Sequence, residues 1–405
     1  MRIAMISEHA SPLAELGGVD AGGQNLHVAD LSTALADLGH EVRIYTRRDA
    51  EDQPVAQPMG DGVSVVNVPA GPARYVPKDL LLPHMKEFGD WVGEHWRDDN
   101  WQPDVTHAHF WMSGLAAIAA SRPIGVPVVQ TFHALGSVKR RHQGAMDTSP
   151  RLRIGYERAI GGAVDRVVAQ CQDEVRELIR LGVPRTRISL IPSGVDAERF
   201  TPDGPAQTRD PDRPVILSVG RMVERKGFAD VIRAMRVVPN AECVIVGGPP
   251  GAELGRDPVA KGLQALAAEC DVANRVRLVG AVPREDMPRW YRSADVLASA
   301  AWYEPFGLTP LEAMACGVPV VASAVGGMLD TVVDGLTGTL VSPRDPRALG
   351  KALRRLVDDR VRRLAYGTAA LDRARSCYSW KRAATQLSSV YASLCRLRRP
   401  TGAVA

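Results

Sequence analysis

The chain has 405 residues, which suits two domains better than a single hydrophobic core. Its composition, 45% hydrophobic and 24% charged, is that of a globular protein, and a net charge of +4 gives no reason to expect a nucleic-acid partner. The six cysteines lie far apart without a C-x-x-C pair, which argues against a disulfide framework and favours a reducing cytoplasm. No apolar run approaches the roughly eighteen residues of a spanning helix, no signal peptide is evident, and membrane association is not indicated.

Short β-branched runs alternate with helix-length segments along nearly the whole chain, which predicts parallel sheets built from βαβ units. One expected helix is Leu26–Leu38, where Leu31, Leu35 and Leu38 share a face. The expected strands are Arg2–Ile6, Glu41–Tyr45, Val63–Val68, Val105–Ala108, Pro127–Thr131, Arg166–Ala169, Ile188–Ile191, Val215–Val219, Glu242–Val246, Val276–Leu278, Val296–Ala298, Val318–Ala322 and Gly338–Val341.

The alternating pattern restarts once, after a stretch rich in Pro, Gly and Asp at 197–213 that has the composition of a linker. We therefore expect an N-terminal domain over 1–200 and a C-terminal domain over 201–379, with a last helix at 380–405 returning to the first. Two doubly wound domains would face each other across a cleft lined by the carboxyl ends of their strands, where such sheets bind ligands. The oligomeric state is open, and a dimer is one possibility.

The first strand leads into a glycine-rich loop at 17–23, and Gln24 and Asn25 open the following helix. Glycines let backbone N–H groups approach an anion, and a helix N-terminus adds a favourable dipole. The spacing is not that of a dinucleotide fingerprint. An anion site and a flexible, glycine-rich helix cap are both consistent with this pattern.

A second loop, Gly220 to Gly227, follows the strand Val215–Val219 and carries Arg221, Arg225 and Lys226. Arg offers a planar fork and Lys a point charge, so the two together suit a diphosphate. An exposed, solvated basic turn is the alternative interpretation.

The third candidate segment runs from Glu304 to Glu312, after the strand Val296–Ala298. We expect its helix to begin near Thr309–Leu311, so that backbone N–H groups there face a ligand and Glu312 lies in the first turns. A carboxylate so placed can accept both hydroxyls of a ribose. Ordinary surface acids at a helix start are the alternative, against which the dense Gly, Pro and aromatic setting argues.

In the first domain, His107, His109 and His133 lie at or just after the ends of expected strands. A histidine there can hydrogen-bond a sugar or transfer a proton. We expect strand alternation to direct the rings of His107 and His109 to opposite faces. No third and fourth ligands are apparent, so no metal site is predicted.

These motifs resemble the family 4 retaining glycosyltransferases, essentially from end to end. The most specific element is the E-x7-E pair Glu304 and Glu312, followed by 313–320 and Gly326-Gly327. The 18–24 loop, Arg221 and Lys226 fit the same pattern. Within the family the chain looks most like the branch with the mycothiol-pathway inositol-phosphate N-acetylglucosaminyltransferases and sucrose-phosphate synthases. The resemblance implies the GT-B fold, two Rossmann-like domains.

For the donor, a nucleotide-diphosphate sugar that we expect to be a UDP-sugar, the resemblance implies specific contacts. Arg221, Lys226 and the backbone at Gly22 and Gly23 would hold the diphosphate, and Glu312 the ribose. The transferred sugar would contact Glu304, His133 and the backbone of Phe306, Gly307 and Leu308. The base would lie beside Val282. His133, Glu304, Arg221 and Lys226 would act in catalysis, without an obligatory cofactor.

For the acceptor, the resemblance implies contacts from His9, Asp20, Gln24, Asn25, Lys78, His109, Phe110, Ala134 and Arg153. Relatives that use an inositol phosphate hold its phosphate with a lysine, a tyrosine, a threonine and an arginine. Here Lys78 matches, Arg153 is a candidate for the arginine, and Phe110 and Ala134 stand where the two hydroxyls would be. These replacements argue against an inositol phosphate and leave a neutral or cationic cyclitol, aminocyclitol or sugar open.

The leading hypothesis is a retaining glycosyltransferase that moves a glucose- or N-acetylglucosamine-type sugar to a small hydroxylated acceptor. Three alternatives remain: a GDP-sugar-dependent transferase acting on a lipid or glycan, a non-hydrolysing nucleotide-sugar epimerase of the same fold, and a nucleotide-sugar-binding protein without catalysis.

Overall fold

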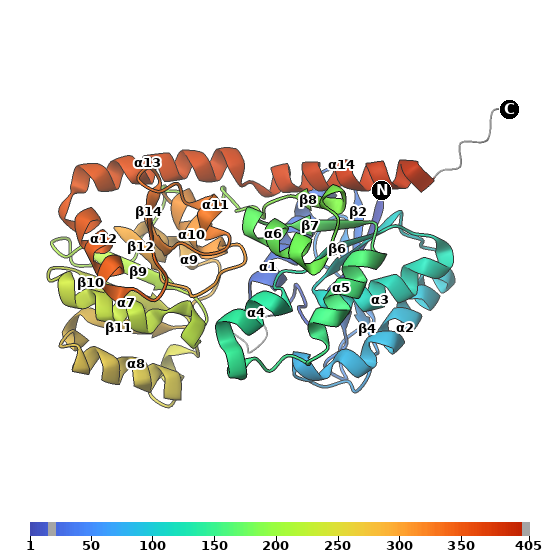
Figure 1. Cartoon of the computed structure of the whole chain (residues 1–405), viewed down its shortest axis with the longest axis horizontal. Helices are drawn as coiled ribbons and strands as arrows, with labels where there is room; N and C mark the ends of the chain where they lie inside the picture. The colour runs from blue at the N-terminus through green and yellow to red at the C-terminus, as the bar shows by residue number, and fades with distance from the viewer. Residues whose placement is uncertain (15–21, 399–405) are drawn as a thin grey trace. The chain divides into compact units, whose positions relative to one another are not determined.

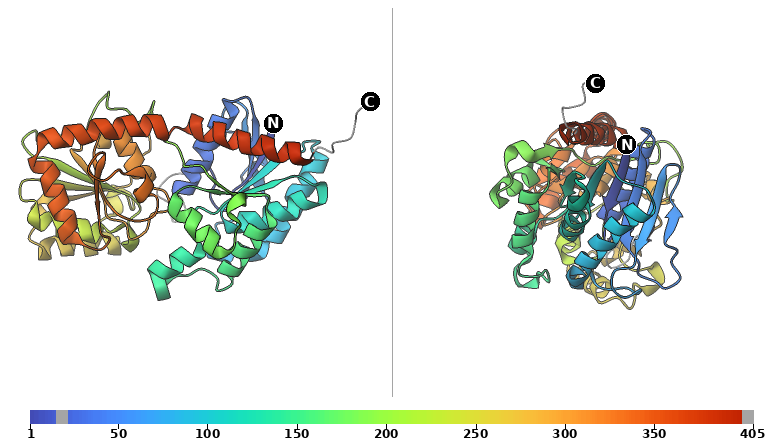
Figure 2. Two further views of the ribbon diagram at one scale, coloured as in Figure 1. Left: turned by 45° about the horizontal axis from the view of Figure 1, so that its top comes forward. Right: turned by 90° about the vertical axis from the view of Figure 1, so that its right-hand side faces the viewer.

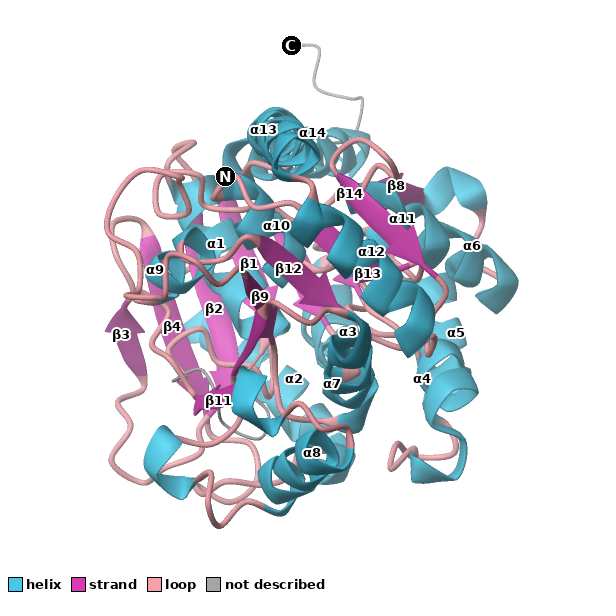
Figure 3. Cartoon of the chain, turned by 90° about the vertical axis from the view of Figure 1, so that its left-hand side faces the viewer, coloured by secondary structure: helices cyan, strands magenta, loops and turns pink. Residues whose placement is uncertain are grey.

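The computed structural model describes residues 1–14 and 22–398. They form two compact units, one with residues up to 192 and from 380 onward and the other with Ser193–Ser379. The division falls before the boundary expected at 200 because Val195 and Phe200 are buried in the second unit's core. In each unit, helices cover both faces of a twisted sheet (Figures 1 and 3).

The described part of the first unit has the strand order β3-β4-β2-β1-β5-β6-β7-β8, in which β3 alone is antiparallel to its neighbour. The strands are β1 (Arg2–Ile6), β2 (Glu41–Arg47), β3 (Ala56–Pro58), β4 (Val63–Val68), β5 (Val105–His109), β6 (Val128–Thr131), β7 (Arg166–Ala169) and β8 (Ile188–Leu190). The helices are α1 (Gly23–Ala36), α2 (Met85–Asp98), α3 (Trp111–Ser121), α4 (Gly136–Gln143), α5 (Arg153–Ala163), α6 (Gln172–Leu181) and α14 (Trp380–Arg398).

The second unit's sheet has the order β11-β10-β9-β12-β13-β14 and is parallel throughout its paired strands. Its strands are β9 (Val215–Val219), β10 (Glu242–Val246), β11 (Val276–Gly280), β12 (Val296–Ser299), β13 (Val320–Ser323) and β14 (Gly338–Val341). Its helices are α7 (Phe228–Ala234), α8 (Pro258–Glu269), α9 (Met287–Arg292), α10 (Leu308–Ala315), α11 (Met328–Thr331), α12 (Pro346–Asp358) and α13 (Arg360–Cys377).

The last helix, α14, belongs to the first unit although the second unit precedes it in the chain. It packs beside α1, as the two ribbon views of Figure 2 show. Its apolar face buries Trp380, Leu387 and Tyr391. The Oη of Tyr391 lies 2.6 Å from Nδ1 of the buried His107 on β5, so the helix is tied to the sheet by a hydrogen bond as well as by apolar packing.

Several local expectations differ from the structure. The helix expected over Leu26–Leu38 ends at Ala36, so Leu31 and Leu35 are buried but Leu38 is 37% exposed. Gly39, with φ of 81°, turns the chain away from the helical face just after Leu38. The short edge strand β3 was not predicted, because its sequence, Ala-Gln-Pro, carries none of the β-branched residues that mark the other strands.

Candidate functional site

In each unit several of the candidate residues lie where the strand order reverses. The reversal lies between β1 and β5 in the first unit and between β9 and β12 in the second. Helices leave neighbouring strands toward opposite faces at such a point, which opens a crevice at the carboxyl ends of the strands. His9 follows β1 and His109 is the last residue of β5, while Arg221 and Glu304 follow β9 and β12.

The basic turn after β9 is shaped by two glycines in the left-handed region, Gly220 at φ of 157° and Gly227 at 71°. A Cβ atom on Gly227 would lie 2.0 Å from the carbonyl oxygen of Ala300, so the turn packs directly on the chain that leaves β12. The backbone N–H of Trp302 donates to the carbonyl of Arg225 at 2.9 Å and joins the same two segments. The basic turn and the Glu304 loop therefore form one structure.

Lys226 and Glu304 form the ion pair of this site, with Nζ donating to Oε2 at 2.6 Å. Burial alone would raise the pKa of Glu304, but the nearby charges of Lys226, Arg225 and Arg221 outweigh it and lower that pKa. Burial also lowers the pKa of Lys226, against the opposing effect of Glu304. A carboxylate and an ammonium group are thus held together in a mostly desolvated, positively charged environment, where electrostatic interactions are strong.

The loop from Glu304 to Gly307 is held by close backbone packing. The N–H of Gly327 donates to the carbonyl of Glu304 at 3.0 Å, and a Cβ on Gly326 would lie 2.1 Å from that same oxygen. Gly307, at φ of 96°, is the N-cap of α10. The helix therefore begins at Leu308, slightly before the expected start near Thr309–Leu311, because the glycine itself makes the turn.

Glu312 is buried on α10 and receives a hydrogen bond from the Oη of Tyr291 at 2.7 Å. The guanidinium of Arg284 lies 3.4 Å from its other oxygen. Val282, just before Arg284, packs in part against the same core as Phe306. Glu312 is therefore a positioned carboxylate inside the fold and does not belong to a solvated helix end.

In the first unit, the start of α1 is tied to two strands. The amide nitrogen of Gln24 donates to Ser7 Oγ at 3.2 Å and to the carbonyl of His109 at 3.1 Å. Asn25 is buried, and its carboxamide bonds the N–H of Gly22 and the carbonyl of Ser11. Gly22 and Gly23 begin the helix. Asp20 lies outside the described residues.

His9 and Phe110 lie together where β1 and β5 end. Their ring centroids are 4.8 Å apart in an edge-to-face arrangement, and His9 Nδ1 is 2.7 Å from the buried Glu8 carboxylate. Phe110 has φ of 84° and ψ of 158°, a conformation essentially confined to glycine, so its backbone is strained. Lys78 lies apart in sequence on the short 3-10 helix η1 (Lys78–Leu80) and is partly exposed.

Arg153 is buried, and its guanidinium is already engaged. Its Nε donates to Glu157 Oε1 at 2.8 Å, and its Nη2 donates to the carbonyl of Ala134. Both oxygens of Glu157 also accept from the backbone N–H of Gly136, at the start of α4. The positive end of that helix and the arginine are thus already neutralised by a carboxylate of this chain.

Four histidines pack together in the first unit: His27, His107, His109 and His133. Burial lowers the pKa of His27 and of His107 to about 3 and holds those of His109 and His133 well below their ordinary values, so the rings are neutral near pH 7. His133 also has a left-handed backbone, with φ of 60°. Strain of this kind at a candidate site residue indicates a position that the surrounding structure enforces.

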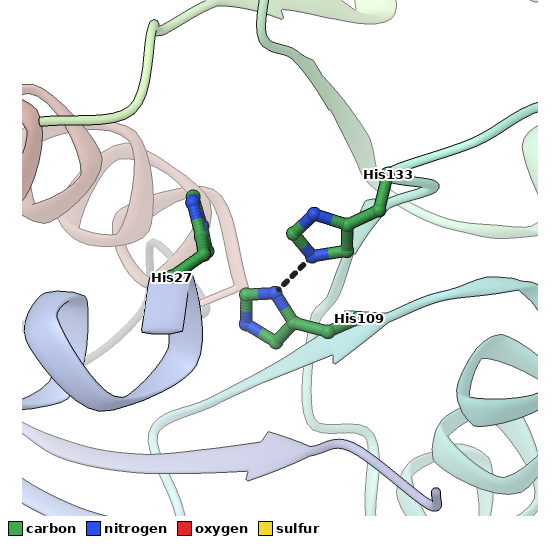
Figure 4. A group of neighbouring side chains, drawn as sticks. All are labelled: His27, His109 and His133. Carbon is green, nitrogen blue, oxygen red and sulfur yellow. Dashed lines mark hydrogen bonds between the residues drawn. The ribbon is translucent and has the colours of Figure 1, made fainter. Parts of the chain in front are cut away.

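The expectation that His107 and His109 face opposite sides of the sheet is wrong, because residues two apart in a strand point the same way. Their ring centroids are 4.2 Å apart. His27 from α1 lies beside His109 and His133, a grouping that the sequence did not indicate (Figure 4).

Sequence analysis missed three residues of these sites: Glu157, Tyr291 and His27. The spacing of Arg153 and Glu157, four residues apart, was a usable signal for a helical ion pair. Nothing local marked Tyr291 or His27, because their partners come from distant parts of the chain.

Comparison with known proteins places the chain among glycosyltransferases. The family model "Glycosyltransferase Family 4" matches residues 21–199, and "Glycosyl transferases group 1" matches 202–373. A D-inositol 3-phosphate glycosyltransferase of Xylanimonas cellulosilytica is 38% identical, over 98% of both chains. D-inositol 3-phosphate glycosyltransferase 1 of Catenulispora acidiphila is 37% identical, over 97% of this chain and 96% of its own.

Among solved structures, sucrose-phosphate synthase from Thermosynechococcus elongatus matches with a TM-score of 0.88 at 30% identity, over 98% of this chain and 99% of its own. HepE of Anabaena, in complex with UDP and glucose, matches with a TM-score of 0.73 at 18% identity, over 97% of this chain and all of its own. The expected two-domain GT-B fold is thereby confirmed. In the described residues, no helix combines the length and apolarity needed to cross a membrane.

Proposed function

The chain belongs to the family 4 glycosyltransferases, and we propose that it transfers a sugar, with retention of anomeric configuration, from a UDP-sugar to a small unphosphorylated cyclitol, aminocyclitol or sugar. The observation that carries the proposal is the ion pair between Lys226, in the turn after β9, and Glu304, in the loop after β12.

The donor half of the proposal rests on the second unit. Arg221 and Lys226 supply positive charge for the diphosphate, and Glu312 supplies a fixed carboxylate for the ribose hydroxyls. The backbone of Phe306, Gly307 and Leu308, together with Glu304, serves the transferred sugar, and Val282 lies beside the base. UDP as the nucleotide is supported by the complex of HepE with UDP and glucose.

Retention fits a displacement on one face of the sugar. The bond from the anomeric carbon to the diphosphate breaks, the acceptor oxygen bonds to that carbon from the same side, and its proton passes to the leaving diphosphate. Such a reaction needs charge stabilisation more than a nucleophilic carboxylate. Lys226 and Arg221 stabilise the leaving group, and the neutral His133 hydrogen-bonds the sugar.

The acceptor half rests on the first unit. Among the residues expected to bind the acceptor, His9, His109 and Phe110 lie at the ends of β1 and β5. Gln24, in the first turn of α1, hydrogen-bonds the carbonyl of His109, and the buried Asn25 positions the start of that helix. A phosphorylated acceptor would need hydroxyls beside the cations, yet Phe110 and Ala134 offer none, and the guanidinium of Arg153 is already engaged by Glu157 and the carbonyl of Ala134. We therefore propose an acceptor without a phosphate, although curated relatives carry the name D-inositol 3-phosphate glycosyltransferase.

The test is a panel of reactions followed by mass spectrometry and proton NMR. UDP-glucose, UDP-N-acetylglucosamine and GDP-mannose are each combined with myo-inositol, inositol 3-phosphate, an aminocyclitol or a hexose. We expect product only with a UDP donor and an unphosphorylated acceptor, with the donor's α-linkage kept.

Each alternative has its own outcome. A β-linked product would refute retention, and a preference for inositol 3-phosphate would refute the acceptor class. An isomerised nucleotide sugar formed without acceptor would indicate an epimerase. UDP binding without turnover on any acceptor would indicate a binding protein.

A further inference from the structure

Glu8 is a fully buried carboxylate just after β1, next to His9, one of the residues expected to bind the acceptor substrate. Its Oε1 lies 2.7 Å from Nδ1 of His9, and its Oε2 accepts a hydrogen bond from the hydroxyl of Ser113 on α3. The same hydroxyl accepts from the backbone N–H of Glu8 at 3.0 Å. The N–H of Arg47 on β2 donates to the carbonyl of Glu8 at 3.0 Å. The carboxylate is therefore fixed in direction as well as in place.

Packing alone does not account for a carboxylate at this position. Glu157, which is equally buried in the first unit, is held by the guanidinium of Arg153. Among the residues that the structure describes, the basic partner of Glu8 is the imidazole of His9 alone. Removing a carboxylate from water is costly, and an apolar side chain of similar size would avoid that cost. The contact with His9 is what a carboxylate provides here and an apolar side chain would not.

This contact determines which nitrogen of His9 carries the proton. An ionised carboxylate only accepts hydrogen bonds, so Nδ1 is the donor, and the neutral ring then keeps its lone pair on Nε2. Nε2 has no hydrogen-bond partner in the described part of the chain, and the residue is partly exposed. The ring of Phe110 packs edge-to-face on the imidazole at 4.8 Å. His9 therefore offers one lone pair, in a fixed orientation, to another molecule.

We propose that Glu8, held by Ser113, is a positioning residue for the acceptor substrate: it fixes His9 so that Nε2 accepts a hydrogen bond from a non-reacting hydroxyl or ammonium group. The inference rests on the proposed function, which puts the acceptor substrate at the ends of β1 and β5. A ring nitrogen backed by a carboxylate attracts hydrogen-bond donors and repels anionic groups. The pair thus favours an amino sugar or aminocyclitol and disfavours a phosphorylated acceptor.

The first experiment follows the ring of His9 by NMR at pH 8, in the full chain labelled with ¹⁵N-histidine. Loss of a signal in His9→Gln identifies that ring. We expect a proton on Nδ1 and none on Nε2 in the unsubstituted chain, and a mixture of both tautomers in the isosteric Glu8→Gln. Glu177→Gln, which removes another buried carboxylate of the first unit, is the matched control and should leave the ring of His9 unchanged.

The same spectra test contact with the acceptor substrate. In the presence of UDP, glucosamine and myo-inositol should shift the Nε2 resonance of His9, and inositol 3-phosphate should not. A proton on Nε2 in the unsubstituted chain would overturn the proposal without any substitution, as would an unchanged tautomer in Glu8→Gln. A resonance that neither glucosamine nor myo-inositol shifts would also overturn it.

Steady-state kinetics with UDP-glucose and glucosamine separate positioning from a structural role. Glu8→Gln should raise the KM for glucosamine about tenfold, the effect of losing one well-oriented hydrogen bond, and leave the KM for UDP-glucose unchanged. An unchanged KM for glucosamine, or equal changes for both substrates, would contradict the role of Glu8. If the unsubstituted chain transfers sugar to no acceptor, the proposed function fails, whereas the NMR measurements still decide whether Glu8 positions His9.

Discussion

At the scale of single residues, Lys226, Glu304 and Glu312 each have a defined hydrogen-bond partner, so that each substitution has a definite expected effect. Lys226 donates to Glu304, and Tyr291 with Arg284 holds Glu312. Desolvation makes each of these contacts stronger than it would be at the surface. We therefore expect substitutions at Lys226 to act mainly on sugar transfer and substitutions at Glu312 to act mainly on donor binding.

Lys226→Ala should lower kcat for transfer roughly 10²–10³-fold, the range seen when one group that stabilises developing negative charge is removed. The measurement is steady-state kinetics alongside circular dichroism, which should show a retained fold. Lys261→Ala, at an exposed lysine of α8, is the matched control and should keep full activity. Turnover unchanged by Lys226→Ala would remove the diphosphate role.

Glu312→Gln should weaken UDP binding roughly 10- to 100-fold, because hydrogen bonds to a charged group contribute about 1.5–3 kcal/mol. Isothermal calorimetry with UDP measures the effect directly. Glu285→Gln removes an exposed carboxylate nearby in sequence and should leave the affinity as it is. Equal affinity in both variants would show that Glu312 does not contact the ribose.

Glu174, buried on α6, makes stability depend on pH. Burial raises the pKa of its carboxyl from 4.5 to about 7, and its Oε1 has no hydrogen-bond partner among the described residues. In the unfolded chain this group loses its proton first, so its contribution to stability falls as pH rises from 4.5 to about 7.

Above about pH 7, the free energy of unfolding lost through Glu174 approaches about 3 kcal/mol. Glu174→Gln should therefore be more stable relative to the parent at pH 8 than at pH 5, as judged by urea midpoints. Glu94→Gln, at an exposed site on α2, should show no such difference. If the difference in urea midpoint between Glu174→Gln and the parent were the same at both pH values, the explanation from the buried carboxyl group would be wrong.

At the scale of elements, glycines shape the loops in two ways: some are needed for a left-handed backbone, and others also because a side chain would not fit. Gly227 and Gly335 have nearly the same φ, 71° and 75°, but a Cβ would lie 2.0 Å from Ala300 oxygen at the first and meets nothing within 4 Å at the second. One position requires both backbone freedom and space, whereas the other requires only backbone freedom.

Gly335→Ala should lower the free energy of unfolding by about 1–2 kcal/mol, the strain of a left-handed residue. Gly227→Ala should cost about 1–3 kcal/mol more, from overpacking. Urea unfolding of the full chain measures the free energy of unfolding of the two variants. If both lost the same amount, the basic turn would be able to move away from Ala300 at no cost.

At the scale of the whole molecule, the chain leaves the first unit at Pro192 and returns to it at Trp380. The returning helix contributes Trp380, Leu387 and Tyr391 to the first unit's interior. Burying a large apolar side chain contributes about 1.5–3 kcal/mol, so these three residues supply a large share of the stability of an ordinary domain.

A chain that ends at Ser379 should therefore lose amide protection in α1 and β5, while the second unit keeps its protection. Hydrogen exchange followed by mass spectrometry resolves the two units in one sample. A chain that ends at Arg398 retains all of α14 and should match the parent. Equal protection in both truncated chains would show that α14 is dispensable for the first unit.

The sequence by itself determined the alternation of strands and helices, the parallel sheets and the segments that carry charge and glycine, because these follow from local periodicity and backbone preference. It also placed Lys226 and Glu304 in the segments that follow two strands, and Glu312 in the first turns of the next helix. Only the tertiary structure decided which side chains meet. The Lys226–Glu304 contact spans 78 positions, and His27 reaches His109 and His133 from another helix.

Such long-range pairings depend on how packed surfaces fit together in three dimensions, and residue spacing along the chain does not encode that fit. The contacts of Arg153, which the resemblance makes a candidate for an acceptor-binding arginine, likewise follow only from the tertiary structure. In the folded chain, Glu157 and the start of α4 enclose it.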